Sequence, residues 1–446
     1  MKNSIKAFSR LSWVILLLFG TIGQLAWSVE NMYFNLFVFE TISPDLDTVT
    51  LMVQLSGITA TVATLIAGVL SDKLANRRSF ISVGYAIWGV TVALFGCLST
   101  ELIASIFNTG AAESLKITLA LVVIGDCVMT LFGSFANDAA FNAWVTDNTE
   151  SSFRGRVESV LSILPLFAML VVAGGFGILA SLIGYRALFI GLGAVISISG
   201  ILGIFIIKDS TKVERSGGMR DIFYGFRPSV VKSNLSLYLT LLIVLIYGIA
   251  SQIFMPYLII YMKTFLSFTV LEYSIVFGAA ILFGALVNFF LGRLSDKTDK
   301  LSLVYFAAIT MSLGLFGMYL ARGMDKLPTL IVFGIFGFVM IVGYIFVTAL
   351  TGSIVRDRTP VGAVGKLQGV RMVFSVLIPM LVGPAVGNLI NKAQNMKLPD
   401  AGADIMTTEY IPAPEIFLAA ALVMLLTLAV VPLIRRFGTD DRVTEE

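Results

Sequence analysis

The stretch Gly68-Val69-Leu70-Ser71-Asp72-Lys73 recurs 224 residues later as Gly292-Arg293-Leu294-Ser295-Asp296-Lys297, a separation of half the 446-residue chain. Each copy ends a long apolar run and opens a cluster of Lys and Arg residues. A duplication of this size at a membrane edge indicates two similar helical bundles in tandem. That architecture is common among secondary transporters.

A second internal match follows the fourth apolar run of each half. Asp147-Asn148-Thr149 recurs as Asp357-Arg358-Thr359, with an offset of 210 residues instead of 224. The difference falls between the two motifs, where the N-terminal half has a longer polar outer loop, residues 99–113, rich in small residues. One insertion in a loop therefore explains both offsets and supports a true repeat.

The composition excludes a soluble protein. Hydrophobic residues make up 57% of the chain and charged residues 13%, whereas a globular domain has about 25% charged residues; the mean hydropathy is +0.92. Each long apolar run can cross a bilayer as a helix. These runs are residues 11–38, 50–70, 79–99, 117–146, 157–183, 185–207, 237–262, 270–292, 301–321, 328–353, 367–390 and 415–434. We predict an all-α polytopic membrane protein with twelve transmembrane helices in two six-helix bundles; the short alternating segments of a β-barrel are not seen.

The bundles are predicted at residues 1–207 and 237–446, with a cytoplasmic linker at residues 208–236. The linker carries six basic residues, which suit anionic lipid, and a hydrophobic stretch that can lie at the membrane surface as a short amphipathic turn. That stretch comprises Ile222, Phe223, Tyr224 and Phe226. A plain flexible linker is the alternative. The outer loop 392–414, with three prolines and no periodicity, is predicted to be irregular.

Basic residues set the expected orientation, because Lys and Arg gather on the cytoplasmic side of a bilayer. With the N-terminus inside, 24 of the 31 Lys and Arg residues fall in inner segments. Both termini are therefore expected in the cytoplasm, and the protein in a bacterial inner membrane or a plasma membrane. The first apolar run continues to about Phe39, which is too long for a signal-peptide core. The formal net charge of +3 reflects the inner-face bias and predicts no nucleic-acid partner.

Several chemistries are excluded or disfavoured by residue usage. The chain contains no histidine, which excludes a histidine proton relay and a histidine-built metal site. Cys97 and Cys127 lie in apolar runs and are interpreted as buried side chains, not as a disulfide. No nucleophile–base pair, metal cluster or soluble catalytic domain is visible. We therefore predict neither an enzyme nor a cofactor.

Twelve spans with the repeated motif after the second and eighth resemble the major facilitator superfamily. Its signature at this place is G-x-x-x-D-[RK]-x-G-[RK]-[RK]. The matching residues here are Gly68, Asp72, Lys73, Arg77 and Arg78, with Ala75-Asn76 where one glycine is usual. The resemblance implies bundles that rock against each other, with charged helix ends as gates. The expected gate residues are Gly68, Asp72, Arg77, Arg78, Asp147, Arg154, Asp296 and Asp357; for Asp296 a solvated helix-end charge is the alternative.

Carboxylates inside membrane spans are costly and mark functional pathways. Of the 28 acidic residues, only Glu30, Asp126 and Asp138 fall well inside spans, and all three belong to the N-terminal half. At about 1.5 Å per helical residue, Asp138 lies near the midplane, whereas Glu30 and Asp126 lie at a similar height nearer the outer mouth. These three are the predicted cation-coupling residues.

Helical phase at about 100° per residue groups the candidate cargo ligands. Ser134, Asp138, Phe141 and Asn142 share one face of the fourth span, and the first span carries a polar and aromatic stripe. In the superfamily, the first, fourth, seventh and tenth helices line the cavity. The predicted substrate-binding residues are Gln24, Trp27, Glu30, Asn31, Asp138, Asn142, Gln252, Tyr344 and Thr348. Amides, hydroxyls, a carboxylate and an indole face suit a polyhydroxylated ligand; the alternative is that several of these residues only bridge helices.

A narrower resemblance concerns the fourth and first spans. Phe141-Asn142-Ala143-Trp144, followed by Asp147, is similar to the helix-four exit of the glycoside–pentoside–hexuronide:cation symporters, and Asp138 matches an Asp that melibiose permeases use for sugar and cation. Leu25, Ala60 and Thr64 stand where those permeases carry other aspartates, which argues against their sodium site. The first span, Gly23 to Glu30, instead resembles the sucrose:proton symporters.

These observations lead to one functional hypothesis and two alternatives. We predict a secondary active transporter, a proton-coupled symporter of a sugar or glycoside that works by alternating access, with Na⁺ as the other possible coupling ion. Its expected partners are a small carbohydrate and the lipid bilayer, and it is expected to be a monomer. A proton-coupled exporter of amphiphilic, drug- or lipid-like compounds is the first alternative. A membrane scaffold or enzyme is the second.

Overall fold

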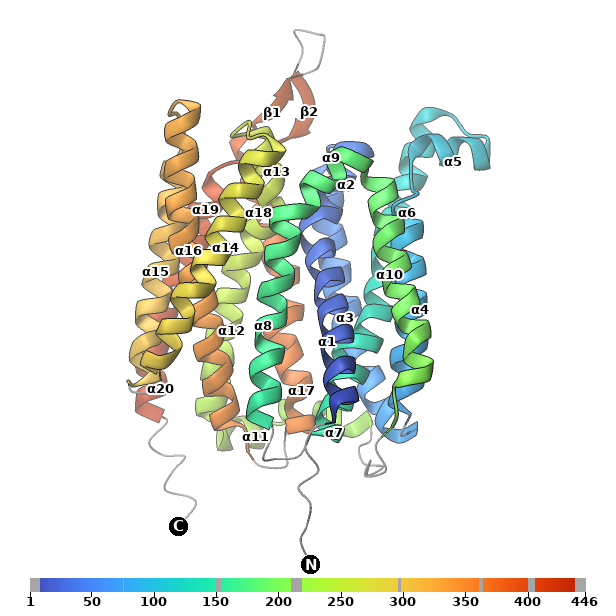
Figure 1. Cartoon of the computed structure of the whole chain (residues 1–446). Helices are drawn as coiled ribbons and strands as arrows, with labels where there is room; N and C mark the ends of the chain where they lie inside the picture. Colours follow the sequence, from blue (N-terminus) through green and yellow to red (C-terminus); the bar gives the residue numbers. More distant parts are fainter. Residues whose placement is uncertain are drawn as a thin grey trace, which may run out of the picture. The chain divides into compact units, whose positions relative to one another are not determined.

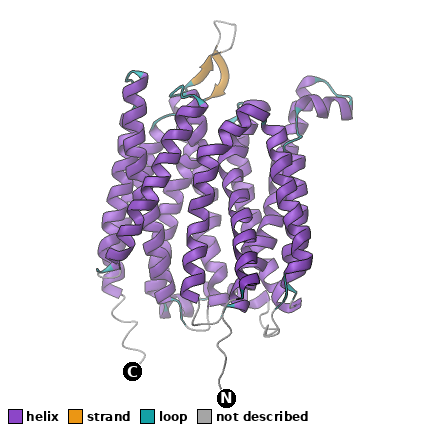
Figure 2. Ribbon diagram, in the orientation of Figure 1, coloured by secondary structure: helices purple, strands orange, loops and turns teal. Residues whose placement is uncertain are grey.

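The computed structural model describes residues 9–74, 76–149, 154–209, 219–295, 298–360, 364–399 and 406–437. Within these residues, twelve helical segments are long and apolar enough to cross a membrane. They overlap the twelve apolar runs of the sequence one for one, so the predicted all-α polytopic fold is confirmed (Figure 1, Figure 2).

The chain divides into two compact units that do not follow the sequence midpoint alone. Unit 1 holds residues 1–37, 41–43 and 58–219, and unit 2 holds residues 38–40, 44–57 and 220–446. One long helix, α3 (Leu46–Leu74), therefore contributes its first turns to unit 2 and the rest to unit 1. Its first turns carry polar contacts within unit 2: Asp47 pairs with Lys392 at 2.6 Å, and Thr50 shares a 2.7 Å hydrogen bond with Tyr257.

Unit 1 contains the first six spans. Besides most of α3, its elements are α1 (Arg10–Val29), η1 (Glu30–Phe34), α2 (Asn35–Thr41), α4 (Arg77–Phe95), α5 (Thr100–Phe107), α6 (Ala111–Gly133), η2 (Ser134–Phe141), α7 (Asn142–Asn148), α8 (Arg154–Val171), η3 (Val172–Phe176), α9 (Gly177–Ile183) and α10 (Tyr185–Ile206). The segments η1, η2 and η3 are π-helical turns inside otherwise α-helical spans.

Unit 2 contains the other six spans and a hairpin. Its elements are η4 (Met219–Phe226, starting at the boundary residue), α11 (Pro228–Ser233), α12 (Leu235–Phe254), η5 (Met255–Tyr257), α13 (Leu258–Thr264), α14 (Val270–Ser295), α15 (Lys300–Leu320), α16 (Lys326–Arg358), α17 (Val364–Met372), η6 (Val373–Leu377), α18 (Ile378–Gln394), β1 (Lys397–Pro399), β2 (Met406–Tyr410), α19 (Glu415–Leu425) and α20 (Thr427–Phe437). Here η6 is π-helical, and η4 and η5 are 3₁₀ helices.

Side-chain caps and one glycine set several span boundaries. Ser9, Asn76 and Asp299 each accept hydrogen bonds from backbone N–H groups in the first turns of α1, α4 and α15, satisfying donors that a helix leaves unpaired. Between α9 and α10, Gly184 takes φ = +80°. That conformation is readily open only to glycine and ends one span before the next begins.

Close helix packing in unit 1 depends on glycines that leave no room for a side chain. A Cβ on Gly89 would lie 2.3 Å from the backbone oxygen of Gly193, and one on Gly200 would lie 2.4 Å from the backbone nitrogen of Ala86. Helices α4 and α10 therefore approach to backbone contact, as small residues permit in membrane proteins. This fixes the face of α4 that carries the site residues described below.

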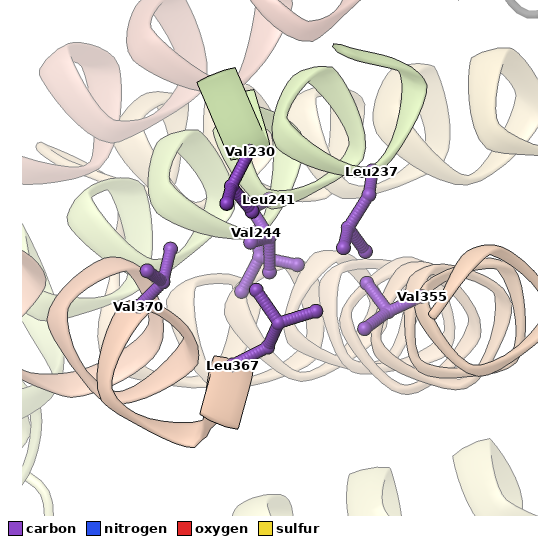
Figure 3. Close-up of a cluster of buried hydrophobic side chains, with 7 residues drawn as sticks. All are labelled: Val230, Leu237, Leu241, Val244, Val355, Leu367 and Val370. Atoms are coloured by element: carbon purple, nitrogen blue, oxygen red, sulfur yellow. The ribbon is translucent and has the colours of Figure 1, made fainter. Parts of the chain in front are cut away.

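The core of unit 2 at the linker end is a cluster of aliphatic side chains (Figure 3). It consists of Val230, Leu237, Leu241, Val244, Val355, Leu367 and Val370, from α11, α12, α16 and α17. Tyr224 of η4 packs against it, whereas Phe223 is 68% exposed. Residues 219–226 and 228–233 of the predicted linker are therefore helical, not a plain flexible connection; residues 210–218 lie outside the described part of the chain.

Two loop predictions need correction. The outer loop at residues 99–113 contains α5, an apolar helix with Ile106 62% exposed, because Ser99 caps it and Leu102, Ile103 and Ile106 give it helical periodicity. The segment 392–414 is not simply irregular: α18 continues to Gln394, and β1 pairs antiparallel with β2. The segment contains a hairpin that its three prolines hid from sequence analysis: Pro399 ends β1, and Pro412 and Pro414 follow β2.

Candidate functional site

Two of the three membrane carboxylates lie in π-helical turns of unit 1. Glu30 is the first residue of η1, and Asp138 lies within η2. A π turn adds one residue to a helical turn and shifts the side chains that follow, and such turns are frequent at functional sites. No residue type in these stretches signals a π turn, so sequence phase alone could not predict them.

The carboxyl group of Asp138 has hydrogen-bond donors on both oxygens. Ser134 Oγ donates to Oδ2 at 3.2 Å, and Asn137 Nδ2 donates to Oδ1 at 3.1 Å. Ser134 and Asp138 therefore lie on one face, as helical phase predicts. Asn142 is exposed, and its amide donates to the backbone carbonyl of Asp138 at 3.1 Å. Phe141 is buried against Phe19 of α1, with ring centroids 6.4 Å apart.

A second acidic group is formed by Glu30 of the first span and Asp126 of the fourth span. Thr130 Oγ1 donates to Glu30 Oε1 at 2.9 Å, and Asp126 lies one helical turn before Thr130 on α6. Glu30 interacts electrostatically with Asp126 and, more weakly, with Asp138. All three carboxyl groups belong to one electrostatic cluster in unit 1.

An indole pair lies beside these carboxyl groups. Trp27 of α1 and Trp88 of α4 have ring centroids 5.1 Å apart. Gly133 of α6 makes room for them, since a Cβ there would lie 2.8 Å from Trp88 and 3.0 Å from Trp27. Among the described residues, neither indole nitrogen has a hydrogen-bond partner, and both are buried. The Trp27 N–H lies near the Asp138 carboxyl group, so the indole and the carboxyl group can act on the same polar ligand.

The other predicted ligands of α1 have ordinary environments. Asn31 is exposed, and its amide donates to the backbone oxygen of Trp27 at 2.8 Å. Gln24 is half-buried on α1, one turn before Trp27 and Ser28. Gln24 and Trp27 are partly exposed and Asn31 is exposed, so these three members of the predicted stripe remain candidate ligands.

The candidate ligands of unit 2 are neutral. Tyr344 of α16 meets Tyr247 of α12 edge to face, with ring centroids 6.5 Å apart. Thr348 is exposed and donates to the backbone of Tyr344 at 2.8 Å. Gln252 lies where α12 and α18 approach closely, because a Cβ on Gly383 would lie 2.4 Å from its Cβ. The helix-bridging alternative applies most directly to Gln252.

The predicted gate residues of unit 1 form a buried ion pair. Arg77, only 4% exposed, binds Asp147 through Nε at 3.1 Å and Ser71 Oγ through Nη1 at 2.5 Å. Ser71 in turn donates to the Gly68 carbonyl at 3.1 Å. This network joins the repeated motif at the end of α3 to the start of α4 and the end of α7.

The remaining gate predictions have different outcomes. The backbone N–H of Arg78 donates to Asp209 at 2.8 Å, and its guanidinium donates to the carbonyl of Ile204. The side chains of Asp72 and Arg154, and all of Asp296, lie outside the described residues. In unit 2, Asp357 pairs with Lys300 at 2.6 Å. The two repeated aspartates, Asp147 and Asp357, thus each hold a cation from the helix that follows the repeated motif.

Sequence reasoning missed the residues that organise the site. Tyr85, Trp88, Thr130 and Asn137 lie in apolar runs and resemble ordinary core side chains, and Ser71 is hidden within the motif itself. Only the pairing of spans shows that Tyr85 and Asn137 meet. A polar residue adjacent to an intramembrane carboxylate, as Asn137 is to Asp138, is the one signal that could have found part of the group.

Among the residues that the structure describes, no group of three or more Cys, Asp or Glu side chains could hold a metal ion. The charged cluster is better suited to protons and to hydrogen-bonding ligands, because two of its carboxyl groups already accept hydroxyl or amide donors.

Comparison with known proteins defines the class. Residues 16–384 match the family described as the Major Facilitator Superfamily, so the chain belongs to that superfamily. It is a membrane transporter and not an enzyme. No curated protein matches the sequence.

Solved structures share the fold at low sequence identity. The nucleoside transporter NupG is 12% identical, with 96% of this chain and 100% of that chain covered and a TM-score of 0.65. A bacterial homologue of the human lysosomal transporter Spinster is 12% identical, with 97% and 98% covered and a TM-score of 0.64. A bacterial homologue of the iron transporter ferroportin is 13% identical, with 95% and 98% covered and a TM-score of 0.63. These likenesses establish the fold and leave the cargo open.

Proposed function

We propose that the protein is a proton-coupled symporter of a sugar or glycoside, of the branch that resembles the glycoside–pentoside–hexuronide:cation and sucrose:proton symporters. The observation that carries this proposal is the arrangement in unit 1 of an indole pair beside an intramembrane carboxyl group. Trp27, which is half-buried and backed by the buried Trp88, offers a ring face, and Asp138 offers acceptor oxygens.

These groups suit the chemistry of a carbohydrate. A sugar ring has an apolar C–H face, which packs on an indole, and hydroxyl groups at its edge, which donate to a carboxylate and accept from an N–H. Gln24, Asn31 and Asn142 add amides on the same unit. The predicted ligands of unit 2, the hydroxyls of Tyr344 and Thr348 and the amide of Gln252, are neutral hydrogen-bonding groups that also suit a carbohydrate.

Coupling is assigned to the carboxyl cluster. A carboxyl group removed from water favours its neutral form unless donors or cations stabilise the charge, and Asp138 has only neutral donors. Glu30 and Asp126 repel each other when both are charged. Glu30 and Asp126 would lie nearer the outer mouth. Proton binding at Asp138 would then favour sugar binding and the occluded state.

The proposed setting follows the distribution of charge. With both termini cytoplasmic, the Arg77–Asp147 pair of unit 1 and the Lys300–Asp357 pair of unit 2 would each lie on the inner side of a bacterial inner membrane or a plasma membrane, and the protein would work as a monomer. Nucleosides are themselves N-glycosides, so they belong in the substrate panel beside free sugars.

The test is solute uptake into proteoliposomes under an imposed pH gradient, preceded by a thermal-shift screen to choose the solute. The screen uses mono- and disaccharides and a nucleoside, with and without sodium, at two pH values. Asp138→Asn is expected to abolish gradient-driven accumulation while solute exchange at equal pH continues, because exchange needs no net proton movement.

The matched control is Asp325→Asn, at an exposed aspartate before α16 that makes no side-chain cap. Accumulation that survives Asp138→Asn unchanged contradicts the assignment. Thermal protection by hydrophobic cations, and by no sugar or nucleoside, would favour the proton-coupled exporter of amphiphiles instead.

A further inference from the structure

A continuous hydrogen-bonded chain connects Asp138 to the backbone of α1. Asn137 Nδ2 lies 3.1 Å from Asp138 Oδ1, Asn137 Oδ1 lies 2.9 Å from the hydroxyl of Tyr85, and that hydroxyl lies 2.7 Å from the carbonyl oxygen of Phe19. Tyr85 and Asn137 are 0% and 3% exposed. The chain therefore crosses the interior of unit 1 from η2 through α4 to α1.

The chain is assembled by close packing and not by chance proximity of flexible side chains. Gly23 of α1 faces it, and a Cβ at this position would lie 2.4 Å from Asn137 Oδ1 and 2.6 Å from the Tyr85 hydroxyl. The ring of Tyr85 is held edge-on by Phe19 at 5.0 Å and by Trp88 at 5.6 Å. The backbone of α1 at Gly23 therefore lies close against both polar groups.

The hydrogen-bonded chain has one more acceptor than the Tyr85 hydroxyl can serve. The Tyr85 hydroxyl has a single proton but two acceptors within reach, Asn137 Oδ1 and the Phe19 carbonyl. An asparagine amide can donate from one end and accept at the other, and a flip exchanges the ends within the same volume. The heavy-atom positions therefore accommodate two hydrogen-bonding arrangements.

The two arrangements belong to the two protonation states of Asp138. When the carboxyl group is ionised, Asn137 Nδ2 donates to it, and Tyr85 donates to Asn137 Oδ1. When Asp138 has bound a proton at Oδ1, that proton is donated to the flipped Asn137 Oδ1, Asn137 Nδ2 donates to the Tyr85 oxygen, and Tyr85 donates to the Phe19 carbonyl. In both states the hydrogens shared by Asp138, Asn137 and Tyr85 along this path have acceptors, and the protein gains only the proton on Asp138.

We propose that Asn137 is a two-position amide switch that, together with Tyr85, reports the protonation state of Asp138 to the backbone of α1. Both are positioning residues, because they act through Asp138 and α1. The Phe19 carbonyl gains a hydrogen bond only when Asp138 is neutral, one to two turns before Gln24 and Trp27 on the same helix. The role of this switch in coupling rests on the proposed proton symport.

The charged neighbours of Asp138 do not replace the switch. Glu30 from η1 interacts electrostatically with Asp126 of α6 and, more weakly, with Asp138. Ser134 from η2 donates to Oδ2, the oxygen that the switch does not use. These groups influence when Asp138 takes a proton, whereas the Asn137 amide and the Tyr85 hydroxyl respond to whether it has done so.

Infrared difference spectroscopy during a pH titration tests the proposal on the full-length protein in lipid, with no transported solute needed. Asp138→Asn identifies the Asp138 carboxyl band, and ring-labelled tyrosine identifies tyrosine bands. We expect a tyrosine band that changes together with the Asp138 band. It should be lost in Tyr85→Phe and in Asp138→Asn, and also in Asn137→Leu, where the Asp138 band itself remains.

Tyr33→Phe is the matched control. Tyr33 is a buried tyrosine of unit 1 that packs on Phe176, with ring centroids 4.9 Å apart, and it is not a member of the hydrogen-bonded chain from Asp138 to Phe19. This substitution should leave the coupled tyrosine band in place. The proposal is overturned if no tyrosine band follows the Asp138 band, if the coupled band persists in Asn137→Leu, or if no Asp138-dependent band titrates at all. A coupled band in a protein that accumulates no sugar would refute the proposed substrate and leave the switch standing.

Discussion

The duplicated ion pairs at the ends of the two bundles permit a matched stability experiment. Asp147→Ala and Asp357→Ala remove the same side chain at equivalent positions of the repeat. Asp147 leaves behind Arg77, which is 4% exposed. Asp357 leaves behind Lys300, which is 33% exposed and also donates to Ser353 at 2.7 Å.

The expected magnitudes differ because the stranded cations differ in their access to water. Removing one partner of a buried pair costs about 3–5 kcal/mol, since the remaining charge has lost its counter-charge. Asp147 is 23% exposed, so we expect about 3 kcal/mol, the lower end of that range. An exposed pair contributes about 0.2–1 kcal/mol, and Asp357 is 59% exposed, so Asp357→Ala should cost less than about 1 kcal/mol.

The assay is unfolding in a mixed-micelle denaturant series, with both variants compared with the parent protein under the same conditions. The double variant Arg77→Met, Asp147→Ala removes the stranded charge and should recover part of the loss seen in Asp147→Ala. Equal losses for the two single variants, or no recovery in the double variant, would show that burial of Arg77 does not set the cost.

Three further perturbations test packing, capping and the linker. Gly200→Ala, which forces a Cβ to 2.4 Å from the α4 backbone, should lower unfolding stability by about 1–3 kcal/mol, whereas Gly191→Ala on the same helix, where no atom lies within 4 Å, should be neutral or slightly stabilising. Partial burial of Asp299 opposes its ionisation, but hydrogen bonds to Ser302 and to backbone N–H groups outweigh it and lower its pKa; its contribution is therefore present above the usual aspartate pKa and lost as pH falls through the lowered value. Asp299→Ala should lower the free energy of unfolding by about 1 kcal/mol near neutral pH and by less in acid; thermal unfolding at both pH values measures the difference. Phe223→Trp should add fluorescence that lipids brominated near the head group quench, measured against the parent protein; no added quenching would place this side chain in water.

The parts of the structure that the sequence predicts are those set by local pattern. A span needs only a long apolar run, and all twelve were visible. The repeat predicted which aspartates correspond, because the motif spacing is local to each half. Helical phase placed Ser134 beside Asp138, since both lie within one turn of a single helix.

The parts that it could not predict depend on contacts between spans. Arg77 and Asp147 were each singled out, but their pairing requires α4 and α7 to meet across 70 residues of chain. Tyr85 was one aromatic residue in an apolar run, and its partners come from α1 and η2. The hairpin β1–β2 is held by pairing across a chain segment of low regularity, which no helical or alternating pattern marks.

The repeat also argues that the hydrogen-bonded chain of unit 1 acts as a unit. With the offsets of 210 and 224 residues, Asp138 corresponds to Thr348, Asn137 to Val347 and Tyr85 to Ile309. In unit 2 a hydroxyl, which donates to its own helix at 2.8 Å, stands in place of the carboxyl group, and aliphatic side chains stand in place of both Asn137 and Tyr85. A single polar member kept among apolar neighbours would be buried without partners, at a cost of about 1–3 kcal/mol. Members of a packing cluster can vary one by one, whereas members of a proton-responsive chain must be present or absent together, and the two halves of this transporter show these two cases.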